Sequence, residues 1–118
     1  MGGTRHIMKS DYVKDHDSAS AFTSPIVKLD YPLDGIYYQF VWDVGVRGQF
    51  LFEVSIMDDY WETLEDCSPV SVGVSTAMKG SKIVAIPQAW FLVSKLRFRW
   101  IPDQSKGLIN VALRITPR

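Results

Sequence analysis

An acidic stretch in the middle of the chain carries the residues whose types could do chemistry. Residues 54–67 read VSIMDDYWETLEDC, where Trp61 lies among five carboxylates, at Asp58, Asp59, Glu62, Glu65 and Asp66. Clustered carboxylate oxygens suit a hard cation such as Ca²⁺, which takes about six to eight oxygen ligands. An aromatic ring beside carboxylates also suits a sugar. The stretch therefore has three readings: a metal site, a sugar site or a simple turn between strands.

The spacing of these carboxylates favours the turn. The D-x-D-x-D-G order of a calcium loop is absent, and Glu62 and Glu65 fall on a strand-like segment, where side chains diverge. Aspartates serve turns well, because their side chains bond to their own backbone and tolerate unusual φ and ψ angles. We expect Asp58 and Asp59 to reverse the chain and place Trp61 in the core. They are the metal candidates of this sequence, but neither a metal nor a cofactor is expected.

Groups that could catalyse a reaction are sparse. Both histidines, His6 and His16, lie in a polar N-terminal segment that also holds Ser18, Ser20 and Ser24. Catalysis needs a nucleophile or an acid–base pair positioned in a cleft, and a loose segment does not position one. Asp58 and Asp59 are adjacent and point apart, whereas the two acids of a glycosidase flank the bond that they cleave. The sequence therefore predicts a protein that is not an enzyme.

Composition argues against several other classes. The chain has 118 residues, and its 13 basic and 13 acidic side chains give a net charge of zero, which argues against a nucleic-acid partner. A single cysteine, Cys67, excludes an internal disulfide and a cysteine-based zinc site. No apolar run approaches the roughly 18 residues of a membrane span, and the first residues lack the apolar core of a signal peptide. We expect one soluble domain, made in the cytoplasm, with no membrane partner.

The elements that must position these residues are strands. From residue 26 onward, apolar residues recur at every second position, the period of a half-buried strand. Strand-like segments lie at 26–31, 36–43, 49–57, 60–66, 69–75, 81–86, 95–100 and 108–116. Each has one apolar face, so two sheets must close over a shared core. The sequence predicts an all-β fold, an antiparallel β-sandwich of jelly-roll or discoidin-like type with seven to nine strands.

Aromatic residues dominate the predicted core. The set comprises Phe40, Trp42, Phe50, Phe52, Trp61, Phe98 and Trp100. Each such ring buries roughly 150–250 Å² and so contributes several kcal/mol to folding. On the other face of segment 95–100 lies a basic ladder typical of a solvated edge or face, formed by Lys95, Arg97 and Arg99.

Residues 1–25 read as an extended N-terminal arm in front of a sandwich domain at residues 26–118. The arm is polar, rich in small residues and without a sustained apolar period. Four apolar side chains are spaced along it, at Met8, Tyr12, Val13 and Phe22. Such anchors among polar residues are typical of an extended segment that docks into pockets of a partner. We expect the arm to add little to the core and to cross to a neighbouring subunit on assembly.

Three stretches together resemble a known group of proteins. They are YYQFVWDVGVRGQFLFEVS at 37–55, the spacing S-x5-W-x2-L formed by Ser55, Trp61 and Leu64, and SKLRFRWIPDQSKGLINVAL at 94–113. This order is similar to that of small β-sandwich proteins encoded by tailed bacteriophages and prophages, which are built like a minimal discoidin-type domain. The resemblance covers residues 26–116, with SIMDDY standing where such proteins have a polar SNDG turn.

The resemblance implies a structural or accessory protein of the virion, such as a head decoration, head–tail or tail component. Its partners would be other virion proteins and copies of itself, and it would be found in the virion after synthesis in the bacterial host cytoplasm. The alternative is a discoidin-type carbohydrate-binding module, in which exposed aromatic side chains at one end of the sandwich contact a sugar. The candidates for that contact are Tyr12, Tyr31, Tyr60 and Trp90.

Overall fold

The computed structural model describes residues 7–29, 33–57, 60–73, 77–91 and 95–117. Ten strands and one short 3₁₀ helix make up its regular structure. The strands are β1 (Ile7–Asp17), β2 (Phe22–Thr23), β3 (Val27–Lys28), β4 (Leu33–Trp42), β5 (Gly48–Ser55), β6 (Glu62–Thr63), β7 (Val70–Val72), β8 (Gly80–Ala85), β9 (Lys95–Pro102) and β10 (Leu108–Pro117). The 3₁₀ helix, η1, spans Gln88–Trp90. Each of the eight predicted segments contains a strand, and the predicted all-β sandwich is confirmed.

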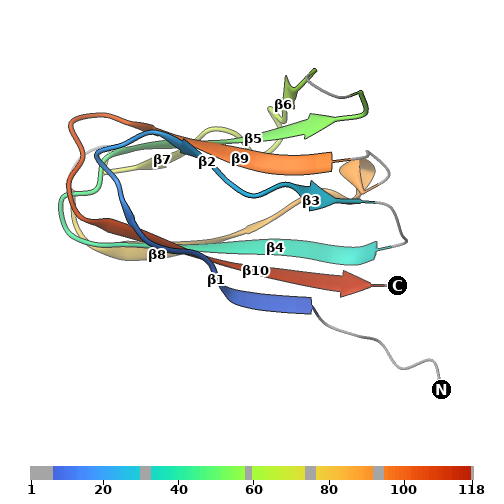
Figure 1. Cartoon of the computed structure of the whole chain (residues 1–118), viewed down its shortest axis with the longest axis horizontal. Coiled ribbons are helices and arrows are strands. Elements are labelled where there is room, and N and C mark those ends of the chain that lie inside the picture. The colour runs from blue at the N-terminus through green and yellow to red at the C-terminus, as the bar shows by residue number, and fades with distance from the viewer. Residues whose placement is uncertain (1–6, 30–32, 58–59, 74–76, 92–94, 118) are drawn as a thin grey trace.

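Two antiparallel sheets form the layers of this sandwich (Figure 1). Sheet A has the strand order β1-β10-β4-β8, and sheet B has the order β2-β9-β5-β6. In sheet B, β3 continues β2 along the same side of β9, and β7 accompanies β6 along the same side of β5. Counting each of these pairs as one interrupted strand gives two four-stranded sheets whose strand order is that of a jelly roll.

The core lies between the sheets and consists mainly of stacked rings. Alternate residues of β4, β5, β9 and β10 point into it, as the period of two predicted. Phe98 of β9 is its centre, because its ring contacts the rings of six other residues: Tyr12, Phe22, Tyr38, Phe40, Phe50 and Phe52. Trp100 is fully buried beside them.

Two of the predicted core tryptophans are only half-buried, and this corrects the sequence prediction. Trp42 ends β4, and its indole N–H donates to the carbonyl of Met78 at 3.1 Å. Trp61 lies under Arg97, whose guanidinium carbon is 3.9 Å from the centroid of the indole ring. Since Arg97 points away from the core, Trp61 covers the outer surface of sheet B, and Leu64 fills the core position instead.

The N-terminal segment departs most from its prediction. Strand β1 pairs with β10 from Ile7 to Asp17, and β2 pairs with β9. Of the four predicted anchors, three pack against the core of their own sandwich: Tyr12, Val13 and Phe22. The expectation that this segment adds little to the core is therefore corrected. Two register shifts in β1 break its apolar period, which hid the strand in the sequence.

Buried serines tie the same segment to sheet B and to the β9–β10 turn. The Ser18 carbonyl accepts the indole N–H of Trp100 at 2.8 Å, and the Ser105 hydroxyl donates to the Ser18 hydroxyl at 2.7 Å. The Ser24 hydroxyl accepts the backbone N–H of Phe98 at 2.9 Å, and the Ser24 N–H donates to the Phe98 carbonyl at 2.8 Å. These bonds satisfy polar groups that the core would otherwise bury without partners.

Candidate functional site

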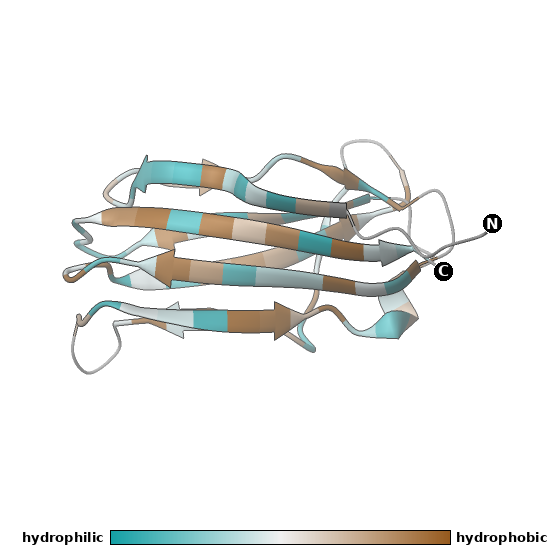
Figure 2. Ribbon diagram, turned by 90° about the horizontal axis from the view of Figure 1, so that it is seen from below, coloured by the Kyte–Doolittle hydropathy of each residue, from teal (hydrophilic) through white to brown (hydrophobic). Residues whose placement is uncertain are grey.

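The outer face of sheet A follows from the alternation that builds the core on its inner side. Tyr38 and Leu113 point inward, so the next residues, Tyr37 and Arg114, point outward. Strand register aligns the outward side chains in rows across the sheet. One row is Met8, Arg114, Tyr37 and Ala85, and the next is Ala112, Gln39 and Ile83. Figure 2 looks onto this face, with its four strands side by side and apolar segments along β4, β8 and β10.

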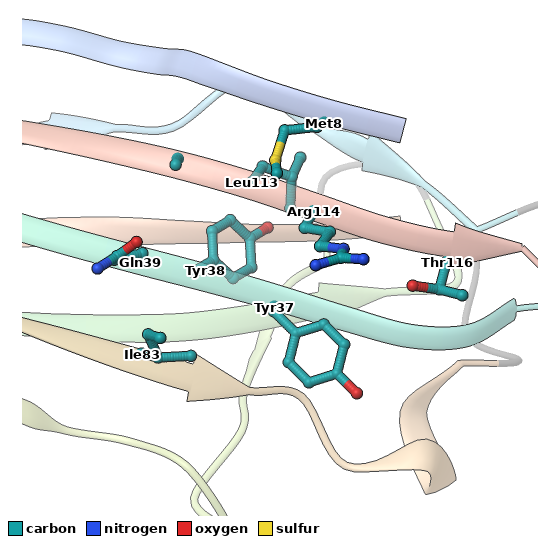
Figure 3. Close-up of a pocket in the computed structure, with 9 residues that line it drawn as sticks. Met8, Tyr37, Tyr38, Gln39, Ile83, Leu113, Arg114 and Thr116 are labelled. Carbon is teal, nitrogen blue, oxygen red and sulfur yellow. The ribbon is translucent and has the colours of Figure 1, made fainter. Parts of the chain in front are cut away.

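A groove of about 480 Å³ lies on this face. Figure 3 shows Met8 and Arg114 on one side of it and Tyr37 and Ile83 on the other, with Gln39 between the strands. Thr116 lines it near the end of β10. The groove therefore combines apolar walls with an amide, a hydroxyl and a guanidinium group, and all of them belong to regular strands that hold them in fixed register.

Gly35 gives the ring of Tyr37 its position in this groove. A Cβ atom at Gly35 would lie 2.6 Å from Cε2 of Tyr37 and 3.0 Å from its hydroxyl oxygen. The hydroxyl end of the ring thus lies against the bare backbone of Gly35, two residues earlier on the same face of β4. A larger residue at 35 would push the ring away.

The chemistry of the sheet A face is unusual for the solvent side of a sandwich. The outward positions of β4 from 35 to 41, of β8 from 81 to 85 and of β10 from 110 to 116 carry one charged side chain, that of Arg114. Met8 and Ile83 are 59% and 63% exposed, and Tyr37 and Val41 are also exposed. Exposed apolar side chains gathered on one sheet face, with few charges among them, are typical of an interaction site.

The outer face of sheet B has the opposite character. Glu53 of β5 is only 7% exposed there and accepts the Nε–H of Arg97 at 2.8 Å and that of Arg99 at 2.9 Å. Strand β9 is an inner strand of sheet B, so these arginines lie on a sheet face, one of the two positions that the sequence predicted. The carboxylate of Glu53 is thus bonded to two guanidinium groups of the same chain, which leaves it no need of an outside partner.

A second hollow, of about 620 Å³, lies at the end of the sandwich that holds β6 and η1 (Figure 1). Tyr60 and Trp90, two of the predicted sugar-contacting aromatics, both line it. Tyr60 is 71% exposed, and the indole N–H of Trp90 donates to Oδ2 of Asp66 at 3.1 Å. Glu62 and Glu65 add carboxylates to the rim. We call this the end hollow.

The remaining predicted site residues fall elsewhere. Tyr12 is packed between the sheets, and its hydroxyl donates to the Pro25 carbonyl, so it does not face a ligand. Tyr31 and the metal candidates Asp58 and Asp59 lie outside the described residues. Within the described ranges, no group of three or more His, Cys, Asp or Glu side chains is placed to hold a metal ion.

Within the N-terminal segment, the side chains of His16, Ser18 and Ser24 serve packing. The His16 ring lies with its centroid 3.8 Å from that of Phe22, and its Nε2 is 3.2 Å from the Ser20 carbonyl oxygen. Ser18 and Ser24 are buried in the hydrogen bonds described above. His6 lies outside the described residues.

In the described part of the chain, no helix is long and apolar enough to cross a membrane.

Cys67 is held as an unreactive thiol. Burial raises its pKa to about 11, the neighbouring Asp66 carboxylate adds to the rise, and the Ser68 hydroxyl opposes it. At pH 8 a thiol of pKa about 11 has roughly 100-fold less thiolate than one of pKa 9, and thiolate is the reactive form. We expect Ellman's reagent at pH 8 to label the folded protein about 100-fold more slowly than the urea-unfolded chain, with the folded rate rising as the pH rises. Equal labelling rates in the two states would contradict this placement of the thiol.

No family model matches this chain, and no curated protein sequence matches it significantly. The function is therefore inferred from the sheet A face and the end hollow. Sequence reasoning found the two aromatics of the end hollow but missed the sheet A face. The available signal was the run of uncharged residues Tyr37, Gln39 and Val41 at alternate positions of segment 36–43, before Asp43 ends the segment.

Proposed function

We propose that this chain is a non-enzymatic structural or accessory protein of a tailed-bacteriophage virion, such as a head decoration, head–tail or tail component. It acts through protein–protein contacts with other virion proteins and with copies of itself. The observation that carries the proposal is the outer face of sheet A, where Met8, Tyr37, Val41 and Ile83 are exposed around one arginine. The resemblance of three sequence stretches to phage sandwich proteins adds the virion as the setting.

Contact through this face agrees with the physical character of the molecule. Apolar area removed from water contributes about 25 cal/mol per Å², so covering these side chains favours association. A net charge of zero leaves little electrostatic repulsion between neighbouring copies. Jelly rolls occur in capsid proteins and in lectins, so the fold by itself is compatible with either role, and the surface has to decide between them.

The test is to look for the chain in particles. Prophage induction in the strain that encodes it, followed by density-gradient purification, should give particles in which mass spectrometry finds this chain at a fixed ratio to the major capsid protein. A chromosomal Ile83→Lys variant should be depleted from those particles, because a charge then lies in the contact face. Purified particles without the chain, or full incorporation of the variant, would contradict the proposal.

A carbohydrate-binding module is the second candidate function, and the end hollow favours it. Tyr60 and Trp90 line one cavity there, with carboxylate acceptors on its rim. Aromatic rings supply apolar contact area, and carboxylates accept hydrogen bonds from hydroxyl groups.

The sugar alternative has its own measurement. A glycan array probed with the parent chain should show ligands that Tyr60→Ala loses by about 10-fold or more and that Tyr37→Ala retains, because both are exposed tyrosines but only Tyr60 lines the end hollow. An array without a ligand, or equal loss in both variants, counts against sugar binding at this site.

A further inference from the structure

We infer that two copies of this chain associate face to face through the outer faces of sheet A, around a two-fold axis that passes close to Gln39. The inference rests on the proposed function and names one partner of that contact face. A second copy of the chain occupies the groove between β1 and β8.

The residue types on the sheet A face are those of an interface centre. Such centres are depleted of lysine, glutamate and aspartate and enriched in tyrosine, methionine and arginine. Tyr37, Met8 and Arg114 lie in one row across the face, and Arg114 is the one charge among the outward positions of β4, β8 and β10 given above. Hot spots of association favour tyrosine and arginine in particular.

The size of the face matches a stable dimer. Strands β1, β10, β4 and β8 have 11, 10, 10 and 6 residues. At about 3.3 Å per residue and about 4.8 Å between strands, they cover about 600 Å² in projection. Side-chain relief raises the accessible area above this projection, which brings it close to the roughly 800 Å² per partner of a standard-sized interface. Two sheets can also pack directly in this way, since stacked sheets lie about 10 Å apart with interdigitated side chains.

The face is also complementary to itself, as a two-fold contact requires. It carries both projecting apolar side chains, Met8 and Ile83, and the groove of about 480 Å³ that can receive them. Gln39 lies in the middle row, between Ala112 and Ile83. Its amide is both donor and acceptor, so two copies of Gln39 facing each other across an axis can pair without a net charge.

Two other surfaces of the described chain suit a second copy less well. On the sheet B face, Arg97 and Arg99 are paired within the chain to Glu53. The free edge of β1 has two register shifts and a positive φ of 50° at Asp15, irregularities that discourage strand pairing along an edge. Face-to-face packing of sheet A is therefore favoured over association through either of these two surfaces.

A charge exchange at Gln39 tests the two-fold contact directly. The parent chain should sediment as a dimer at micromolar concentration. Gln39→Lys and Gln39→Glu should each weaken self-association by about 10-fold or more, because each places like charges together across the axis. An equimolar mixture of the two variants should recover the dimer, since opposite charges then meet. Circular dichroism should show all of them folded, because Gln39 is exposed.

A matched pair of isoleucine variants locates the contact. Ile83→Lys, on the face, should weaken dimerisation by about 10-fold, whereas Ile56→Lys, at the rim of the end hollow and 76% exposed, should leave it unchanged. A parent chain that stays monomeric, equal effects of the two isoleucine variants, or a mixture of Gln39 variants that does not recover would overturn the inference. The particle experiment remains separate: a monomeric chain that still enters particles through Ile83 refutes self-pairing and leaves the proposed function standing.

Discussion

Deletion of residues 1–24 is expected to leave a chain that does not fold. The deletion removes β1 and β2, and with them three side chains packed on the core, at Tyr12, Val13 and Phe22. It also leaves the buried indole N–H of Trp100 without its acceptor on Ser18. Full burial of an apolar side chain contributes about 1.5–3 kcal/mol, of which these partly buried residues supply a share. An orphaned buried polar group costs about 1–3 kcal/mol, and the backbone pairs of β1 with β10 are lost as well. Their sum approaches the whole stability of a domain, which is about 5–15 kcal/mol.

Circular dichroism and urea denaturation of the truncated chain measure this effect. Lys14→Ala is the matched control, because Lys14 is exposed on β1 and its removal should change the free energy of unfolding by less than about 0.5 kcal/mol. The sequence alone suggested the reverse result, a folded sandwich that fails only to assemble. A truncated chain with a cooperative transition close to that of the parent would restore that first interpretation.

Phe98→Ala should give the largest loss of stability for a single substitution in this core. The ring is fully buried, and it lies with its centroid 5.1 Å from that of Phe40 and 5.6 Å from that of Tyr38, at the centre of the ring cluster that joins the two sheets. Truncation of a buried phenylalanine to alanine costs about 3–5 kcal/mol, because the neighbours cannot close the cavity. Urea denaturation should show this decrease in the free energy of unfolding.

Two comparisons make the Phe98 result specific. Phe98→Leu keeps most of the volume and should cost clearly less than Phe98→Ala. Tyr60→Ala removes a ring of similar size from an exposed position and should change the free energy of unfolding by less than about 0.5 kcal/mol. A loss below about 1 kcal/mol for Phe98→Ala would show that the ring cluster does not hold the sheets together.

The central strands could be predicted because both of their faces repeat regularly. In β4, β9 and β10 the inward residues are large and apolar over the full length, so the period of two survives for eight to ten residues. The same regularity placed Phe98 and Trp100 in the core. It did not place Trp61, because a tryptophan can lie equally well under an arginine on the outside of a sheet, and the sequence does not contain the distance between them.

The N-terminal strand was missed because its contacts are long-range and its period is broken. Tyr12 and Val13 are consecutive and both pack against the core, which requires the irregularity that the register shifts of β1 supply. Its other attachments use Ser18 and Ser24, whose partners lie more than 70 residues away in the chain. Small polar residues carry no periodic signal for such bonds.

The two candidate surfaces could not be predicted from the sequence for the same reason, because each combines residues that lie far apart in the chain. Tyr60 and Trp90 were suspected one by one as exposed aromatics, but only the fold shows that they share one hollow. The sheet A face combines residues from four strands, and Met8 and Ile83 are separated by most of the chain in sequence. One strand with an uncharged outer face carries little information, whereas the outward positions of three adjacent strands, β8, β4 and β10, together hold one charged side chain, that of Arg114.

The pairing of Ile7 with Ile115 has a mechanical consequence. The two ends of the described chain leave the sandwich side by side at the same end (Figure 1). Tension between these ends loads the outermost pair of β1 and β10 first and then each following pair in turn. The hydrogen bonds between antiparallel strands are perpendicular to the strands. When β1 is pulled away from β10 at one end, these hydrogen bonds therefore break one after another and do not resist the force together. The chain ends are thus a weak point of this domain when tension is applied between them.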